Sequence, residues 1–323
     1  MATQDIEPPE IGRIINIILL SSLVMVLPGI EWSLFGWLHV FLPLLSFFLL
    51  SRYGRYTGMR LLLSAVTISL LVSLVVSSLD LFVFSFTLLL SGFVLYQSAD
   101  RHESPALSGF KTAASLAGGW LIVMTILSAG SELSAYGQLL KTLDQGIIEA
   151  LEYYRQSDTV STETLVVLET TLYQMQVLVP MVMPAILGSL ILMITWLTMV
   201  IGNTLLLKTS GRAVWSSYRS WQLPEKLIWV VIIMAVLALI PTQPLRAVGI
   251  NSLILLSIIY CFQGLSIVVF FMHKWDVPLL LRSFFYVMIV FQSLGTLVLL
   301  FFGIADIWFD FRKLKLATTN KTE

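Results

Sequence analysis

The chain has 323 residues, of which 57% are hydrophobic and only 12% are charged, and its formal net charge is zero. Soluble domains carry about 25% charged residues, and a globule of this size cannot bury so much apolar surface, because surface area grows nearly as fast as mass. The composition therefore excludes an ordinary soluble protein, gives no indication of nucleic-acid binding, and predicts an all-α protein whose helices are surrounded by lipid.

A polar segment at 1–11 precedes the apolar part of the chain, and we expect it to be retained because it lacks the features of a secretory signal. Beyond it, charged residues mark the ends of predicted spans, since a charge at the bilayer centre costs at least about 2.5–3.5 kcal/mol. Charge-free apolar runs occur at 14–30, 32–51, 61–79, 81–99, 112–131, 170–207, 227–245, 247–272 and 283–305. Most have about 20 residues, enough to cross about 30 Å of hydrocarbon. We therefore predict a polytopic transmembrane helical bundle of eight or nine spans.

The predicted spans fall into two groups, one of about five spans at 12–131 and one of about four at 183–305. The run 170–207 is too long for a single crossing. Because proline interrupts a helix, we expect Pro180 and Pro184 to divide this run into a helix outside the membrane and a span at about 184–207.

Residues 132–182 form a predicted helical extramembrane insertion between the two groups. Apolar residues recur at spacings of three and four from Leu139 to Tyr154 and again from Leu165 to Met175, the pattern of two amphipathic helices. We expect the second helix to begin at Ser161. The insertion is either a cap that packs on the spans or lies at the interface, or a lid over an outward-facing cavity.

Basic residues predict the orientation of the spans, because loops rich in Lys and Arg stay in the cytoplasm. Those assigned to the cytoplasmic side are Arg13, Arg52, Arg55, Arg60, Arg101, Lys111, Lys208, Arg212, Arg219, Lys226, Lys274 and Arg282. The acidic stretch 132–169 then lies outside. Nine crossings would place the basic C-terminal tail outside as well. Either that tail breaks the rule or one of the last three runs does not fully cross.

The segment 306–323 is a predicted basic amphipathic tail at the water boundary. Its aromatic residues suit the membrane interface and its basic residues suit lipid headgroups. In a helix, Asp306 and Asp310 would stack and repel unless a cation joined them, for example Arg52 or Arg55 from another loop, or a divalent ion. A helix would also bring Asp310 to Lys313 and Trp308 to Arg312. These seven residues are the candidate interface or anchor residues, with partner contact and a metal or catalytic role as alternatives.

Polar side chains within the apolar runs are candidate ligand-binding or cavity-lining residues, because polar groups in hydrocarbon must find partners. The candidates are His39, Trp196, Asn203, Asn251, Gln263 and Gln292. If they converge on one cavity, they predict a site for a small polar molecule. If they lie apart, we expect each of them to form hydrogen bonds between helices. The spans hold no Asp, Glu, Lys or Arg, which argues against an ion-coupled pump.

Motifs for common enzyme chemistries are missing from the sequence. It contains no P-loop, no His-Glu-x-x-His motif and no pair of cysteines, and the lone Cys261 lies in an apolar run. We therefore expect no cofactor, no metal and no catalytic residue, although an intramembrane enzyme stays an alternative.

Three stretches carry a resemblance to a known family. FLPLLSFFLLSRYGRYTGMR at 41–60 has a proline-containing span followed by an Arg-x-Gly turn, FQGLSIVVFF at 262–271 has Gln-Gly within a late span, and GIADIWFDFRKL ends the pattern at 303–314. Together they resemble the YybS-like family of uncharacterised bacterial membrane proteins over about 12–314. That resemblance implies a multi-pass protein of the bacterial inner membrane. Residues 12–130 are also similar to the substrate-binding S components of energy-coupling-factor transporters.

Three classes of function follow as hypotheses. The first is binding or transport of a small polar molecule in a cavity beneath the 132–182 helices. The second is a non-enzymatic membrane scaffold that contacts other membrane proteins through its basic loops and tail. The third is the intramembrane enzyme. In each case the lipid bilayer is the expected surrounding.

Overall fold

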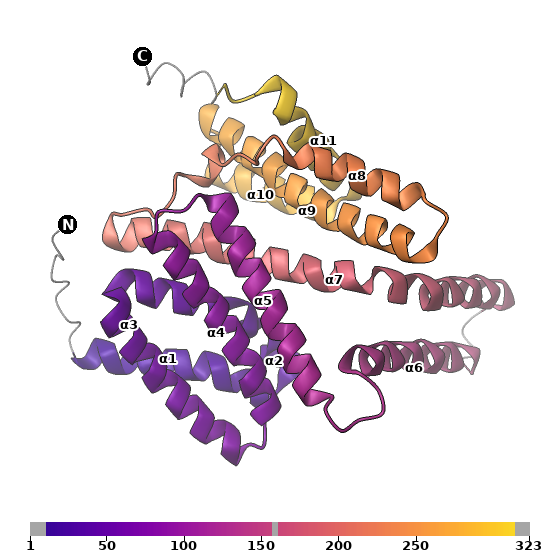
Figure 1. Cartoon of the computed structure of the whole chain (residues 1–323), viewed down its shortest axis with the longest axis horizontal. Coiled ribbons are helices and arrows are strands. Elements are labelled where there is room, and N and C mark those ends of the chain that lie inside the picture. The colour runs from indigo at the N-terminus through magenta and orange to yellow at the C-terminus, as the bar shows by residue number, and fades with distance from the viewer. Residues whose placement is uncertain (1–10, 157–160, 314–323) are drawn as a thin grey trace.

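The computed structural model describes residues 11–156 and 161–313, and these residues fold into helices joined by short connections (Figure 1). The α-helices are α1 Ile11–Ile30, α2 Trp32–Phe35, α3 Leu42–Val75, α4 Leu79–Asp100, α5 Pro105–Leu127, α6 Ala135–Arg155, α7 Thr162–Ser210, α8 Leu227–Leu239, α9 Gln243–Lys274, α10 Leu279–Phe291 and α11 Ser293–Phe309, with 3-10 turns η1 Gly36–Phe41 and η2 Tyr218–Ser220. The predicted all-α class is confirmed. Most of the N-terminal polar segment and most of the C-terminal tail lie outside the described residues.

Six of the described helices are long and apolar enough to cross a membrane, or seven if the bent pair of α10 and α11 counts as one span. The predicted eight or nine spans exceed this count. One reason is α8, whose 13 residues extend only about 20 Å. Another is the segment Trp32–Val75, which counts as one candidate span although the sequence predicts two.

Helix α3 reverses direction sharply at Gly54, whose φ of +77° is easily reached only by glycine. An added Cβ at Gly58 would lie 2.7 Å from the carbonyl oxygen of Leu49, nine positions earlier in the chain. The two arms of α3 therefore lie side by side near the turn. They correspond to the separate runs that the sequence predicts at 32–51 and 61–79.

The N-terminal group consists of α1, α3, α4 and α5, packed around a core of leucines and Trp120. Small residues allow close approach of these helices. An added Cβ at Gly92 of α4 would lie 2.2 Å from the carbonyl oxygen of Pro43 on α3. Ser22 of α1 donates a hydrogen bond to the carbonyl of Ala65 on α3 at 3.3 Å.

Helix α7 is continuous over 49 residues, about 73 Å, and links the two groups by packing on α3, α5 and α9. The predicted break at Pro180 and Pro184 is wrong, because both prolines lie inside the helix. Asn251 of α9 supplies the reason. Its side-chain amide donates to the carbonyl of Met181 at 2.8 Å and accepts from the backbone N–H of Ala185 at 2.8 Å. Ala185 N–H and the carbonyl of Met181 are the i, i−4 pair next to Pro184, and Asn251 bridges them, so both groups stay hydrogen-bonded at the proline-containing turn.

Helix α6 lies beside the N-terminal half of α7, at the end of the molecule far from the chain termini (Figure 1). Ser134 and Ser161 cap the starts of the two helices by accepting from Gly137 N–H and Thr164 N–H. The predicted start of the second amphipathic helix at Ser161 is therefore confirmed. Because α7 does not stop at Pro184, the second amphipathic segment and the following span form one rod.

The C-terminal group is α8 to α11. Two glycines form the crossing of α9 and α11: an added Cβ at Gly264 would lie 2.0 Å from the carbonyl oxygen of Leu299, and one at Gly303 would lie 2.0 Å from that of Tyr260. The chain bends by 97° between α10 and α11. The last apolar run is thus a broken span or a re-entrant pair rather than a straight crossing.

The loops rich in basic residues lie at one end of the bundle, here called the basic end and defined by 52–60, 100–104 and 208–226. Two side chains join parts of it. The indole N–H of Trp215 donates to the carbonyl of Glu103 at 3.1 Å, and the guanidinium of Arg312 donates to the carbonyl of Arg219 at 2.9 Å. The described end of the chain therefore lies at the basic end. This favours the alternative in which one of the last runs does not fully cross.

Candidate functional site

A groove of about 500 Å³ lies between the two helix groups, near the basic end. Its walls come from the start of α5, the middle of α7, the 211–226 loop and α9. The lining is mainly apolar and includes Phe110, Leu192, Met199, Trp221, Leu223 and Ile259. We refer to this feature as the inter-group groove.

Trp196 and Gln263, two of the predicted cavity-lining residues, lie together in the inter-group groove. The indole of Trp196 stacks on the ring of Phe262, with centroids 4.8 Å apart and planes 6° from parallel. Tyr218 packs edge-on against the same indole and donates from its hydroxyl to the carbonyl of Phe262 at 2.5 Å. Burial raises the pKa of Tyr218, so this phenol stays protonated.

Thr195 gives the groove a polar group without an internal partner. Its side chain is 5% exposed, and its hydroxyl has no hydrogen-bond partner among the described residues. Thr195 also lines the groove. A buried hydroxyl that lacks a partner costs about 1–3 kcal/mol, and a ligand with a polar atom in the groove would remove that cost.

A buried ionic network lies behind Gln263. The side-chain amide of Gln263 donates to Asp306 at 2.8 Å, and Arg312 donates to the same carboxylate oxygen at 2.9 Å. The side chains of Arg312 and Asp306 are 0% and 3% exposed. Arg312 also donates to the hydroxyl of Ser266 at 3.0 Å, so both ions are bound to α9 as well as to each other.

Several predictions about this segment are wrong. The apolar runs end next to a buried carboxylate, Asp306, whereas the sequence suggested that no charge is buried among the spans. The cation that joins it is Arg312 of the same segment, not Arg52 or Arg55. The reason is a chain reversal: α11 ends at Phe309, and Asp310 adopts a left-handed conformation with φ of 38°.

Because the chain reverses at Asp310, residues 306–313 do not form the single helix on which the predicted pairs of tail residues depend. Trp308 is 66% exposed while Arg312 is buried against Asp306, so the predicted stacking of Arg312 on Trp308 does not form. Lys313 is exposed, as is Arg55, and Arg52 is half-buried. The seven anchor residues are therefore a buried pair, the half-buried Arg52 and Asp310, and three exposed side chains.

The other predicted cavity residues lie apart from the groove. His39 is buried in the N-terminal group, 2.7 Å from the hydroxyl of Ser85 on α4. Asn203 accepts from the backbone N–H groups of Val214 at 2.9 Å and Trp215 at 3.1 Å, and thereby shapes the start of the 211–226 loop. Each of these two side chains is hydrogen-bonded within its own region and is not part of the groove.

Asn251 and Gln292 are also separate from the groove. Asn251 holds the proline-containing part of α7, as described above. Gln292 is exposed at the bend between α10 and α11. The predicted set of six therefore does not converge, and only Trp196 and Gln263 share a site. Nothing in the sequence marks Tyr218 or Thr195 as their neighbours, apart from the position of Thr195 beside Trp196.

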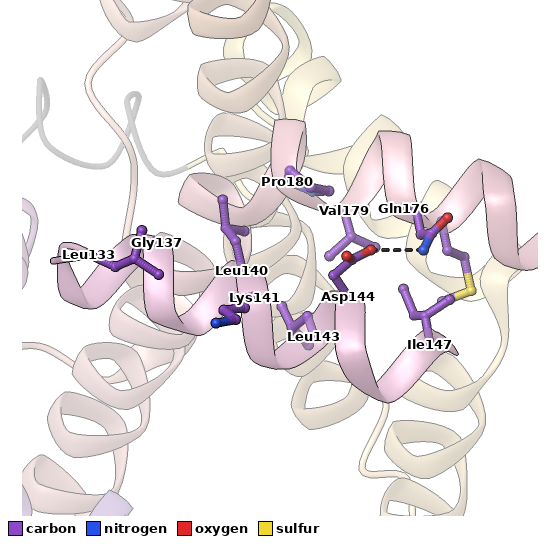
Figure 2. A pocket seen from close by; sticks show the side chains of 11 residues that line it. Leu133, Gly137, Leu140, Lys141, Leu143, Asp144, Ile147, Gln176, Val179 and Pro180 are labelled. Atoms are coloured by element: carbon purple, nitrogen blue, oxygen red, sulfur yellow. Dashed lines mark hydrogen bonds between the residues drawn. The ribbon is translucent and has the colours of Figure 1, made fainter. Parts of the chain in front are cut away.

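A second pocket of about 450 Å³ lies between α6 and α7, in the region where the sequence predicts a cavity beneath the 132–182 helices (Figure 2). Apolar residues such as Leu140, Ile147 and Val179 line it. Figure 2 shows Asp144 of α6 facing Gln176 of α7, whose amide donates to the carboxylate at 2.8 Å. The six predicted cavity residues are not among its lining, so the expected location and the expected residues do not coincide.

Comparison with known proteins identifies the family to which the chain belongs. The profile of the family described as "Predicted membrane protein (DUF2232)" matches residues 14–307. The chain belongs to this family. A search of curated proteins and a search of solved structures gave no match. Membership of DUF2232 agrees with the apolar helices in identifying a multi-pass membrane protein, and it carries no assigned activity. The resemblances to YybS-like proteins and to S components receive no support from these comparisons.

Proposed function

We propose that this DUF2232 protein is a non-enzymatic protein of the bacterial inner membrane that binds a small molecule in the inter-group groove, for storage, presentation or transport. The observation that carries the proposal is a mainly apolar groove whose wall includes Thr195, a residue with a buried hydroxyl that has no hydrogen-bond partner among the described residues. Sites for small molecules have this character: about 300–1,000 Å³, largely apolar, with a few polar groups that orient the ligand.

The position of the groove supports a binding role. Its walls belong to both helix groups, with α5 on one side and α9 on the other. Ligand sites occur preferentially at such junctions, because a small relative movement opens or closes them. The aromatic pair of Trp196 and Phe262 offers a flat wall, and Gln263 is held in place by Asp306.

The groove can be filled by one substitution on α5. An added Cβ at Gly109 would lie 3.3 Å from the flexible side chain of Met199, so Gly109→Leu would project into the groove without striking the backbone. Gly118 on the same helix has nothing within 4 Å of an added Cβ, and Gly118→Leu is the matched control. Both changes replace a helical glycine, which favours the helix by similar amounts.

The experiment is native mass spectrometry of the purified protein in detergent. We expect a co-purified small molecule on the wild type and on Gly118→Leu, and its loss from Gly109→Leu. The proposal fails if the wild type carries no ligand and takes up none, or if Gly109→Leu retains the ligand unchanged.

A membrane scaffold is the second candidate function. The observation that favours it is the basic end, where Arg55, Arg60, Arg101, Arg219 and Lys226 are exposed. A photo-crosslinking residue in place of Arg55 would then form defined adducts with another membrane protein in cells, while one in place of Ser131, in the connection between α5 and α6, would not. Equal adducts at both positions would contradict a specific partner surface.

A further inference from the structure

The mouth of the inter-group groove is formed by the beginning of a helix. Ser104, Pro105, Ala106 and Leu107, the cap and first turn of α5, all line it. In the first turn of α5, Pro105 has no N–H and Ser104 accepts from the N–H of Leu107, so the attraction for an anion comes mainly from the helix macrodipole, which adds about half a positive charge at a helix N-terminus. The mouth of the groove therefore favours a negatively charged group.

Basic residues are chain neighbours of residues that line the groove. The 211–226 loop contains Arg212, Arg219 and Lys226 against one acidic residue, Glu225. Lys226 is exposed and lies between Pro224 and Leu227, which both line the groove. Arg219 is also exposed and lies between the lining residues Tyr218 and Trp221.

The acidic residue next to α5 is already engaged. The carboxylate of Glu103 forms an ion pair with Lys111 and accepts from the hydroxyl of Ser98. These hydrogen bonds lower the pKa of Glu103, so its charge is present at neutral pH but is balanced by Lys111. The mouth thus keeps an excess of positive charge.

The interior of the groove has a different character from its mouth. Phe110, Leu192, Met199 and Phe262 give it apolar walls, and Phe110 is 72% exposed, on a helix that the sequence places in lipid. The groove therefore joins the lipid-facing surface to the basic end. A molecule that matches both parts has a hydrocarbon chain and an anionic head.

We propose that the inter-group groove binds an anionic membrane lipid, with an acyl chain between α5, α7 and α9 and its phosphate between the start of α5 and Lys226. This deepens the proposed function and rests on it. The buried hydroxyl of Thr195 is a polar partner inside the groove for the ester region of the lipid.

The test titrates the full-length protein in detergent with dioleoyl phosphatidylglycerol or dioleoyl phosphatidylcholine and counts bound lipid by native mass spectrometry. We expect tighter binding of the anionic lipid. Lys226→Gln is expected to weaken that binding about fivefold, the effect of one basic residue near an anionic headgroup. The matched control is Lys274→Gln, at the end of α9, which has no groove-lining residue beside it in the chain, whereas Lys226 lies between the lining residues Pro224 and Leu227, and this control is expected to change nothing.

Two further arms separate the alternatives. Inorganic phosphate at millimolar concentration is not expected to displace the lipid; displacement would indicate a site for a free anion and overturn the inference. Equal affinity for the two lipids, with both lost in Gly109→Leu, would also overturn the inference while leaving the proposed function intact. If Gly109→Leu changes the binding of neither lipid and no other ligand is found in the groove, the lipid inference and the proposed function both fail.

Discussion

The pair of Asp306 and Arg312 illustrates how single residues stabilise this protein. Both ions are almost fully buried, and each has further hydrogen bonds to α9 or to the loop that carries Arg219. A buried pair contributes little compared with a well-packed apolar pair, but removal of one partner leaves an uncompensated charge. We infer that the network holds the end of the chain and the 211–226 loop on α9.

Arg312→Met is therefore expected to be strongly destabilising, by about 3–5 kcal/mol, because the buried carboxyl group of Asp306 is left without its cation. The double variant Asp306→Asn with Arg312→Met is expected to recover part of that loss. Thermal unfolding in detergent measures both. Glu169→Gln is the control, since its pair with Arg155 is exposed and contributes only about 0–1 kcal/mol. A double variant no more stable than Arg312→Met would contradict the ionic origin of the effect.

At the scale of elements, helices approach each other closely at glycines, and an amide side chain of one helix hydrogen-bonds the backbone of another. The crossing of α9 and α11 leaves no room for a side chain at Gly264 or Gly303. In α7, by contrast, an amide side chain makes the contact: Asn251 hydrogen-bonds the backbone in the turn that contains the two prolines. Packing between helices thus decides where α7 continues and where α11 lies.

Gly303→Val tests the importance of this crossing. The added side chain would overlap the carbonyl of Tyr260, so α11 has to move away from α9 and the bond between Gln263 and Asp306 is expected to lengthen or break. We expect a large fall in unfolding temperature and loss of ligand from the groove. Gly118→Val, at a position with open space, is expected to be mild. Wild-type stability in Gly303→Val would show that α11 does not pack as described.

At the scale of the whole molecule, the two helix groups are connected through α7, and the basic loops gather at one end. Because α3 turns sharply at Gly54 and the chain bends between α10 and α11, helices of unequal length fit into this arrangement. The contact of Arg312 with the carbonyl of Arg219 places the described end of the chain at the basic end.

This topology predicts which residues an impermeant thiol reagent reaches in intact cells. In a Cys261→Ser background, Ser131→Cys is expected to react, because it follows α5 at the end opposite the basic loops. Lys208→Cys and Lys313→Cys are expected to react only after the membrane is opened. Reaction of Lys313→Cys in intact cells, with Lys208→Cys still protected, would place the two on opposite sides of the membrane.

The amino-acid sequence by itself determined the class of the protein, most helix positions, the amphipathic pair α6 and early α7, and the basic end. These properties follow from the hydropathy and charge of short segments, which act locally and can be counted residue by residue. It also singled out Trp196 and Gln263, although among residues that proved to be unrelated contacts. Helical spacing indicates the face on which a polar residue lies, but not the neighbour that it meets.

Only the tertiary structure decided which residues share a site. The groove combines α5, α7, α9 and a loop that are distant in the chain, and the cation for Asp306 reaches it through a reversal at Asp310. The side chain that bonds the backbone of α7 beside Pro184 is that of Asn251, 66 positions after Ala185. Such contacts arise from packing between segments, which no property of either segment alone can specify.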